Sequence, residues 1–197
     1  MRKTINDVLN SGIIGTPKFL EANLSYFRDN KPRLQNPEAA GGALLEIGIY
    51  PLNFALMAFG DKIKSVDSSV FINDNGVDEQ ETITINFEDG KMASLNSSIA
   101  VNSNRKGIIS GDKGYIEIEN INNPESLSVY DAEYHKIKSI LCPTQITGFE
   151  YEVESCKKAI EQGKTEPEEM KWADTLKVLS VMDNLRKDWN LKFPQEL

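Results

Sequence analysis

Three polar side chains stand out in an otherwise apolar stretch, and they are of the types that bind substrates and move protons. The stretch is GGALLEIGIYPLNFALMAFG, residues 41–60, and its conspicuous polar members are Glu46, Tyr50 and Asn53. Their spacing of i, i+4 and i+7 puts all three on one face of a regular helix. A carboxylate and a phenol that face a cleft can transfer protons or bind a substrate. The alternative is a buried core helix whose few polar groups find hydrogen-bond partners.

The helix that carries these residues is predicted to be irregular near Tyr50. Pro51 has no N–H to donate to the carbonyl of Ile47, and it restricts the backbone of the residue before it. We therefore expect a kink or a broken first turn that swings the Tyr50 phenol outward. A membrane span is excluded as an interpretation, because the run is slightly short and because Glu46 and Pro51 are costly inside lipid.

Length and composition describe an ordinary soluble globular chain and exclude several partners. With 197 residues, 40% hydrophobic and 26% charged, the chain can form one large domain or two small ones. A net charge of −8 argues against nucleic acid or an anionic membrane as a partner. One histidine and two scattered cysteines assemble no zinc-type ligand set, so no metal is expected. The cysteines show no pairing pattern, which favours the reducing cytoplasm.

Beyond the central helix the hydrophobic pattern changes to period two, which predicts a sheet. Turn residues at Asp89-Gly90 and at Asp112-Lys113-Gly114 predict hairpins. A polar loop, residues 28–40, leads into the central helix. The resulting meander implies an α+β fold with an open-faced, mainly antiparallel sheet and helices packed on one face. The predicted strands are residues 18–27, 66–72, 83–87, 93–101, 107–111, 115–119, 127–130 and 136–141.

Two helices are predicted to close the chain. Thr147 and Glu150 form a capping box for the first helix, which Gly163 ends. The second helix runs from about Trp172 to Trp189, and Trp172 could alternatively wall a substrate pocket. Both apolar stripes are expected to face the core. Their members are Phe149, Val153, Cys156 and Ile160 in the first helix, and Leu176, Leu179, Met182 and Leu185 in the second.

The face of the sheet that points away from this predicted core is lined by small, uncharged residues. A solvated sheet face usually displays lysine and glutamate, partly to prevent association. We therefore predict a homodimer that joins two open sheet faces across a two-fold axis. The alternative is a polar face that is merely solvated. On the best hairpin this face carries Thr82, Thr84, Asn86, Ser94, Asn96 and Ser98.

The chain resembles a known family in two segments, GGALLEIGIYPL and PEEMKWADTLKVLSVMDNLRKDWNLKFP. Together with the meander between them, they are similar to the C-terminal half of Gfo/Idh/MocA oxidoreductases, especially the members like dimeric dihydrodiol dehydrogenase and xylose dehydrogenase. The resemblance covers essentially the whole chain. It implies hydride transfer between NAD or NADP and a sugar, polyol or related CH–OH substrate. It also implies an N-terminal Rossmann domain and a C-terminal sheet that holds substrate residues and forms the dimer.

The resemblance also assigns roles by position in the motif. Tyr50 stands where the family has its catalytic histidine or tyrosine, and Glu46 stands where the family's acid is normally aspartate. Asn53 occupies a position that is often aspartate, and Arg33 resembles a loop arginine of this subgroup. Arg33, Asn53 and Trp172 are therefore the candidate substrate-binding residues, and Tyr50 and Glu46 the candidate catalytic residues.

A Rossmann domain is not visible in this sequence, since no GxGxxG loop follows a predicted strand. We expect residues 1–14 to be a linker helix from a missing nucleotide-binding domain, and residues 15–197 to be the substrate-binding and dimerisation domain. NAD or NADP belongs to the full-length enzyme, and neither is expected to bind this chain alone. A phenol that accepts a proton needs a nearby cation, which the sequence does not visibly supply, so the isolated chain is expected to be inactive. The rival hypothesis is a stand-alone, non-catalytic homodimeric module that binds a polyol or a partner protein.

Overall fold

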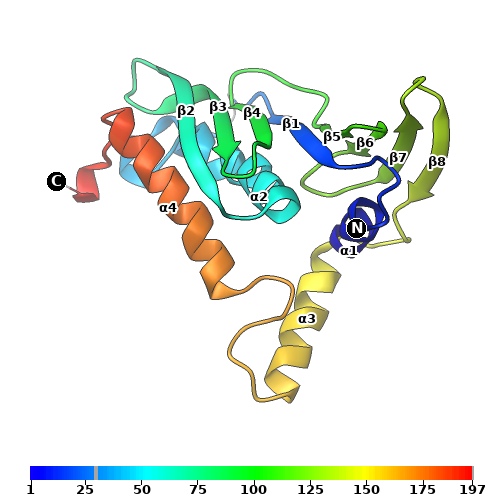
Figure 1. Ribbon diagram of the computed structural model, residues 1–197. Coiled ribbons are helices and arrows are strands. Elements are labelled where there is room, and N and C mark those ends of the chain that lie inside the picture. The colour runs from blue at the N-terminus through cyan, green and yellow to red at the C-terminus, as the bar shows by residue number, and fades with distance from the viewer. Residues whose placement is uncertain (29–30, 197) are drawn as a thin grey trace.

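An eight-stranded sheet with helices on one face forms the frame of the molecule, which confirms the predicted α+β fold (Figure 1). The computed structural model describes residues 1–28 and 31–196. The strands follow the spatial order β2-β3-β4-β1-β5-β6-β7-β8. Their bounds are β1 Pro17–Ser25, β2 Ile63–Ile72, β3 Asp78–Phe87, β4 Met92–Ser98, β5 Gly107–Gly111, β6 Gly114–Glu119, β7 Ser126–Asp131 and β8 Lys136–Leu141.

The first strand lies in the middle of the sheet, between β4 and β5. Leu20 of β1 pairs with Ala93 of β4 in parallel register and with Ile109 of β5 in antiparallel register. The other strand pairs are antiparallel, as the meander predicted. A parallel pair requires a long crossover connection, and here the loop, the central helix and the β2–β3 hairpin make that connection.

The predicted hairpin turns are confirmed. Gly90, between β3 and β4, has a φ of +85°, a conformation that glycine adopts without steric cost. Asp112 and Lys113 connect β5 to β6, and Gly114 follows with a φ of +151°. The polar loop before the central helix contains two short 3₁₀ helices, Pro32–Gln35 and Pro37–Ala39, and residues 29 and 30 of it lie outside the described residues.

Helices α1 (Arg2–Asn10), α2 (Ile49–Phe59) and α4 (Trp172–Asp188) contribute to one core beneath the sheet. Alternate residues of the strands, including Ile83, Ile85 and Leu95, face these helices and are almost fully buried. Helix α1 packs into the same core through Ile5 and Val8. Among the described residues, one helical segment, 37–59, is long and apolar enough to pass a composition test for a membrane span. More than half of that window is buried inside the protein, as expected of a core helix.

Helix α3 (Phe149–Glu161) overturns the prediction that its apolar stripe faces the core. Phe149, Val153 and Ile160 are 68%, 63% and 75% exposed, and Cys156 is also exposed. Periodicity shows which face of a helix is apolar, but it does not show what covers that face. Figure 1 shows α3 projecting beyond the sheet, so the sheet does not cover the stripe.

The helix ends predicted for α3 and α4 are close to the observed ones, although the packing of α4 is only partly as predicted. The carboxylate of Glu150 accepts a hydrogen bond from the Thr147 backbone N–H at 3.1 Å, which is half of the predicted capping box. In α4, Met182 and Leu185 are buried as predicted, whereas Leu176 is 65% exposed. Leu179 is also exposed. The reason is that only the C-terminal half of α4 lies against the sheet (Figure 1).

Candidate functional site

The central motif folds as a wide helical turn followed by a regular helix. Residues Leu44–Gly48 form a π-helix, in which the Ile49 N–H donates to the carbonyl of Leu44, and α2 follows directly. This confirms the predicted irregularity near Tyr50. Pro51 lies in the first turn of α2, directly after the π turn, and has no N–H to donate to a carbonyl of that turn. Single π turns inside helices are uncommon and often lie at functional sites.

A buried aspartate holds the start of this turn. The Leu44 N–H donates to Oδ2 of Asp78 at 2.6 Å, and Asp78 is 1% exposed. Gly42 has a φ of +116°, and a Cβ on it would overlap the Asp78 carboxylate. Burial raises the pKa of Asp78 from its ordinary value of 3.8 to about 6, although hydrogen bonds from the backbone N–H groups of Leu44 and Ala43 oppose the shift. The carboxylate therefore spans the gap between β3 and the first residues of the motif.

A second buried acid lies under the end of the turn. Glu81 accepts a hydrogen bond from the Ser97 hydroxyl, and a Cβ on Gly48 would lie 2.7 Å from its Oε1. Burial, together with the negative charge of Asp78, raises the pKa of Glu81 well above its ordinary value. Its Oε2 has no hydrogen-bond partner among the described residues. Burial therefore favours the protonated form of Glu81.

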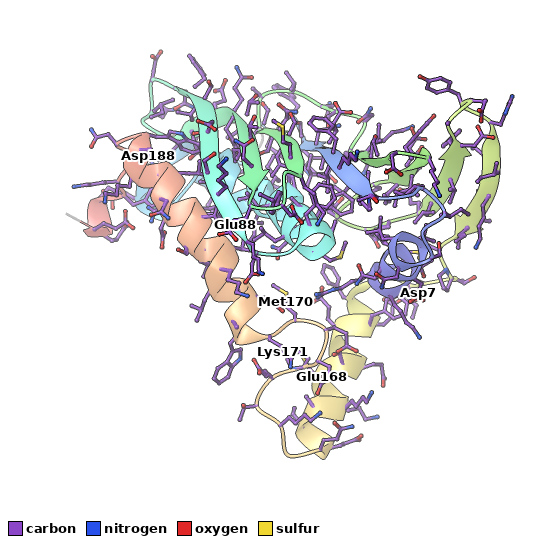
Figure 2. The ribbon with its side chains drawn as sticks, in the orientation of Figure 1. Asp7, Glu88, Glu168, Met170, Lys171 and Asp188 are labelled. Carbon is purple, nitrogen blue, oxygen red and sulfur yellow. The ribbon has the colours of Figure 1, made fainter. Side chains whose placement is uncertain are left out.

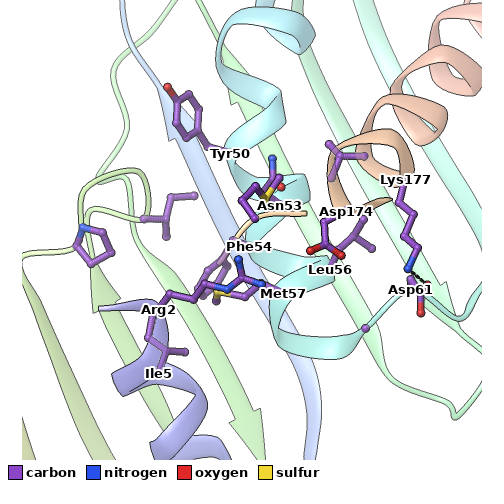
Figure 3. Close-up of a pocket in the computed structure, with 15 residues that line it drawn as sticks. Arg2, Ile5, Tyr50, Asn53, Phe54, Leu56, Met57, Asp61, Asp174 and Lys177 are labelled. Atoms are coloured by element: carbon purple, nitrogen blue, oxygen red, sulfur yellow. Dashed lines mark ion pairs between the residues drawn. The ribbon is translucent and has the colours of Figure 1, made fainter. Parts of the chain in front are cut away.

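Tyr50 and Asn53 lie together on a pocket of about 450 Å³ between α1, α2 and the start of α4 (Figure 3). Tyr50 is 43% exposed at one edge of the pocket, as predicted, although the helix continues through Pro51 without the predicted break. The Asn53 amide donates to the carbonyl of Ile49 at 3.0 Å, which fixes its orientation and leaves its oxygen available. The lining residues are Arg2, Ile5, Tyr50, Asn53, Phe54, Leu56, Met57, Gly60, Asp61, Ile121, Pro124, Met170, Asp174, Lys177 and Val178.

Glu46 is not among the residues that line this pocket, which differs from the prediction of one shared cleft. Its Oε2 lies 2.6 Å from Nη2 of Arg33, and both side chains are partly exposed. The π turn that holds Glu46 interrupts the regular α-helical spacing on which the shared face was predicted. Glu46 therefore pairs with Arg33, whereas Tyr50 and Asn53 both line the pocket.

The cationic groups at the pocket already have partners. Lys177 forms an ion pair with Asp61 (Figure 3), which raises the pKa of Lys177 and lowers that of Asp61. The Arg2 guanidinium donates to the backbone carbonyl of Glu169, which joins α1 to the loop before α4. Trp172 is 63% exposed and does not line this pocket. A phenol and an amide with room for a small molecule suit a ligand that carries hydroxyl groups.

Neither a metal nor a dinucleotide fits the described residues as a resident group. No three histidine, cysteine, aspartate or glutamate side chains in the described ranges come close enough to hold a metal ion. The pocket lacks a glycine-rich turn at a helix N-terminus of the kind that cradles a pyrophosphate. A dinucleotide would therefore need groups from another domain.

Several functional candidates were missed by sequence reasoning. Asp78 lies in a run of polar residues, so the sequence pattern does not indicate that its carboxylate is buried. Glu81, in contrast, alternates in β3 with Ile83 and Ile85, so it lies on the same face of the strand as they do. The alternating pattern could therefore have predicted its burial. Arg2 and Lys177 are far from the motif in sequence, and no pattern links them to it.

Comparison with known proteins agrees with this fold and motif. The family model described as "GFO/IDH/MocA C-terminal domain" matches residues 3–117. The chain is 30% identical over 197 residues to trans-1,2-dihydrobenzene-1,2-diol dehydrogenase of Xenopus tropicalis, covering 96% of this chain and 59% of that enzyme. It is 26% identical over 160 residues to scyllo-inositol 2-dehydrogenase (NADP(+)) of Bacillus subtilis, covering 81% of this chain and 48% of that enzyme. The chain thus spans less than two thirds of the length of these relatives.

Solved structures show the same fold. The 3-ketoreductase KijD10 from Actinomadura kijaniata, in complex with NADP and TDP-benzene, superposes with a TM-score of 0.82 at 20% identity, over 95% of this chain and 58% of that one. An aldose-aldose oxidoreductase from Caulobacter crescentus, complexed with glycerol, gives a TM-score of 0.81 at 22% identity, over 94% of this chain and 57% of that one. With the family model matching more than half of its residues, this chain belongs to the Gfo/Idh/MocA oxidoreductases, of which it is a C-terminal domain.

Proposed function

We propose that this chain is the substrate-binding and dimerisation domain of an NAD(P)-dependent oxidoreductase that acts on a sugar, a polyol or a related CH–OH substrate. The observation that carries the proposal is the exposed phenol of Tyr50, which opens with Asn53 into a 450 Å³ pocket directly after the family's glycine motif. Relatives that match most of this chain are dehydrogenases of a diol and of an inositol.

In this proposal the residues of the chain bind the substrate and move one proton. NAD or NADP, held by another domain, supplies the hydride acceptor when the enzyme is assembled. The Tyr50 hydroxyl accepts the proton that the substrate hydroxyl loses and passes its own proton to a base that the other domain must supply. The Asn53 amide oxygen accepts a hydrogen bond from a second substrate hydroxyl. Glu46 and Arg33 form an ion pair that does not line the pocket, so in this proposal neither of them carries the proton.

The test is a chimera in which the N-terminal part of the Xenopus tropicalis enzyme, the part that this chain does not cover, is fused ahead of residue 1. We expect oxidation of a diol or polyol that depends on NAD or NADP, and we expect Tyr50→Phe to lower kcat by about 10²- to 10⁴-fold. Tyr134→Phe is the matched control, since Tyr134 is 78% exposed on the turn between β7 and β8. A Tyr50→Phe chimera with unchanged kcat would remove Tyr50 from the reaction.

The isolated chain offers a second test, because no phosphate-cradling loop lines its pocket. Calorimetric titration is expected to show no low-micromolar affinity for NAD or NADP. Saturable binding of a polyol by the chain, combined with a chimera that stays inactive, would favour the rival function of a non-catalytic binding module.

The dimer is proposed to form through the open face of the sheet. Thr82 and Asn96 are exposed there and share a 2.9 Å hydrogen bond, and Phe71 adds an exposed apolar side chain at the edge. Ser98, which was assigned to this face, is almost fully buried. Facing sheets approach to about 10 Å, and a stable interface needs at least about 1,000 Å² of buried area.

Like charges at the middle of that face should separate two copies. We expect wild type to be dimeric by light scattering and Thr84→Lys/Asn96→Lys to be a folded monomer, since each lysine would lie near its symmetry mate. A monomeric wild type, or a folded double variant that remains dimeric, would contradict this assignment of the interface.

A further inference from the structure

Two guanidinium groups lie against one tyrosine ring near the candidate site. The guanidinium carbon of Arg28 lies 4.4 Å from the centroid of the Tyr26 ring, and that of Arg105 lies 5.8 Å from it. Both distances are within the range of a cation–π contact. Nη1 of Arg105 also donates to the Tyr26 hydroxyl at 3.5 Å, and that hydroxyl donates to Oδ1 of Asn122 at 3.4 Å. We call Tyr26, Arg28 and Arg105 the arginine cluster.

The backbone holds the arginine cluster in place. The N–H of Arg28 donates to the carbonyl of Ile99 at 2.9 Å, which ties the chain after β1 to the chain after β4. Arg105 has a φ of +58°, a conformation that is uncommon for a residue other than glycine. Its N–H donates to Oδ1 of Asn23, in β1, at 3.1 Å. Strained backbone that is fixed in this way is found most often at functional sites.

The arginine cluster borders the pocket that contains Tyr50. The carbonyl of Arg105 accepts a hydrogen bond from the N–H of Ile121 at 2.9 Å, and Ile121 lines the pocket. Gly107, two residues after Arg105, packs so closely on Phe54 that a Cβ on it would lie 2.7 Å from that ring. Phe54 follows Tyr50 by one helical turn and lines the pocket as well. The cluster therefore lies next to the pocket wall that Ile121 and Phe54 form.

The cations on the α1 and α4 side of the pocket are engaged elsewhere. Arg2 donates to a backbone carbonyl, and Lys177 forms an ion pair. Met170 of the loop before α4, labelled in Figure 2, lines this side of the pocket with an apolar side chain. In Figure 3 the Tyr50 ring points away from Arg2 and Lys177. An anionic group on a ligand held at Tyr50 therefore finds its cations in the arginine cluster.

The two guanidinium groups of the cluster retain donors for a ligand. In residues 1–28 and 31–196, neither of them forms an ion pair with a carboxylate. Glu119 and Glu125 are the acids that act on Arg105 through space. Glu119 pairs with the Lys106 ammonium at 2.8 Å, and Glu125 accepts a hydrogen bond from an asparagine amide at 3.0 Å. A guanidinium presents its N–H donors as a planar fork that matches the oxygens of a carboxylate or a phosphate.

We propose that the arginine cluster binds an anionic group of the substrate, a carboxylate or a phosphate, an inference that rests on the proposed function. The substrate is then an acidic sugar or polyol, with its CH–OH group at Tyr50 and its anion on Arg28 and Arg105. Two like charges against one ring repel each other, and an anion between them relieves that repulsion. Because the chain has a net charge of −8, a general attraction of anions to its surface does not explain such binding.

Three six-carbon compounds test the role of the anion. D-Gluconate carries a carboxylate, D-glucitol 6-phosphate carries a phosphate, and D-glucitol is their neutral counterpart. In calorimetric titration of the isolated chain, we expect at least one of the two anions to bind about ten- to hundredfold more tightly than D-glucitol, because hydrogen bonds between ionised groups are the stronger ones. The tighter of the two anions identifies the acidic group. Equal affinities for the three compounds, or no binding of either anion, would overturn the proposal.

A matched pair of variants locates the bound anion. Arg105→Gln and Lys136→Gln each remove one cation that lies over a tyrosine, but Lys136 lies 5.4 Å from the ring centroid of Tyr130, on β7 and β8. We expect Arg105→Gln to reduce the preference for the anion at least about tenfold, and Lys136→Gln to leave it within about twofold. Arg28→Gln, which changes no residue at positive φ, should act like Arg105→Gln. Urea unfolding checks that each variant is folded. A preference that survives in both arginine variants, or that is lost in Lys136→Gln, would contradict the proposed site.

The chimera described above distinguishes failure of this proposal from failure of the proposed function. An active chimera that oxidises anionic and neutral polyols with equal kcat/KM would refute the anion site and leave the proposed function in place. An inactive chimera, combined with an isolated chain whose preference for an anion depends on Arg105, would refute the proposed function and leave the anion site in place.

Discussion

Because the carboxylate of Asp78 is buried, we expect the free energy of unfolding to depend on pH. Burial raises its pKa in the folded protein from 3.8 to about 6. The folded state therefore binds the proton more tightly than the unfolded state does. The resulting stabilisation is fully present below about pH 4 and is lost as the pH rises to about 6. At pH above 6 the loss amounts to about 3 kcal/mol of the free energy of unfolding.

Substitution of Asp78 by Asn isolates this contribution. The Asn oxygen can still accept the hydrogen bond from Leu44, but the side chain no longer titrates. Relative to Asp78→Asn, wild type should lose about 1.5 kcal/mol of unfolding free energy between pH 5 and pH 7.5. Any constant difference in packing or hydrogen bonding cancels in this comparison. Urea unfolding followed by circular dichroism at several pH values measures it.

Two controls sharpen the result. Asp89→Asn removes an exposed acid whose pKa Lys91 holds below its ordinary value, so its effect should be constant over this pH range. Repeating the Asp78 comparison in a Glu81→Gln background removes the neighbouring acid, whose titration depends on the charge of Asp78. A wild type that gains stability relative to Asp78→Asn as the pH rises, or a difference that does not change with pH, would refute this reasoning.

Three further substitutions are checked by urea unfolding or thermal melting. Gly42→Ala should destabilise the protein by about 1–3 kcal/mol, because a side chain at φ +116° is strained and would overlap Asp78; an unchanged midpoint would contradict this. Arg33→Ala should cost less than about 1 kcal/mol, because the ion pair with Glu46 is partly exposed; a larger loss would show a structural role. Ile5→Ala should cost about 2–5 kcal/mol, since Ile5 is 2% exposed in the shared core; a negligible loss would mean that α1 is only loosely attached.

Local patterns predicted the strands well, because each strand and turn is specified by neighbouring residues. Asp89-Gly90 and the alternation around it fix the β3–β4 hairpin without any knowledge of the rest of the chain. The position of β1 is a different matter. Its insertion between β4 and β5 depends on contacts such as Leu20 with Ala93, which are distant in sequence. No local pattern encodes that choice.

The predictions for the packing of α3 and for the position of Glu46 were wrong for different reasons. For α3 the sequence specified the helix but not what covers its apolar face, and for Glu46 the sequence pattern did not reveal the type of helical turn. The stripe of α3 has the period of a core helix, yet the described chain provides no surface against it. The α-helical spacing of Glu46 and Tyr50 does not hold, because the segment between them is a π turn.

Two glycines of the motif, Gly42 and Gly48, can now be explained by the two buried acids. Gly42 lets the backbone approach the Asp78 carboxylate, and Gly48 lets it approach Glu81, so each glycine lies where a side chain would displace an acid. The two contacts lie at either end of the π turn. Because the turn is held at both ends, its rotation relative to α2 is fixed, and with it the direction of Tyr50. In this protein the glycine spacing of the motif therefore serves the geometry of the site through Asp78 and Glu81, neither of which belongs to the motif.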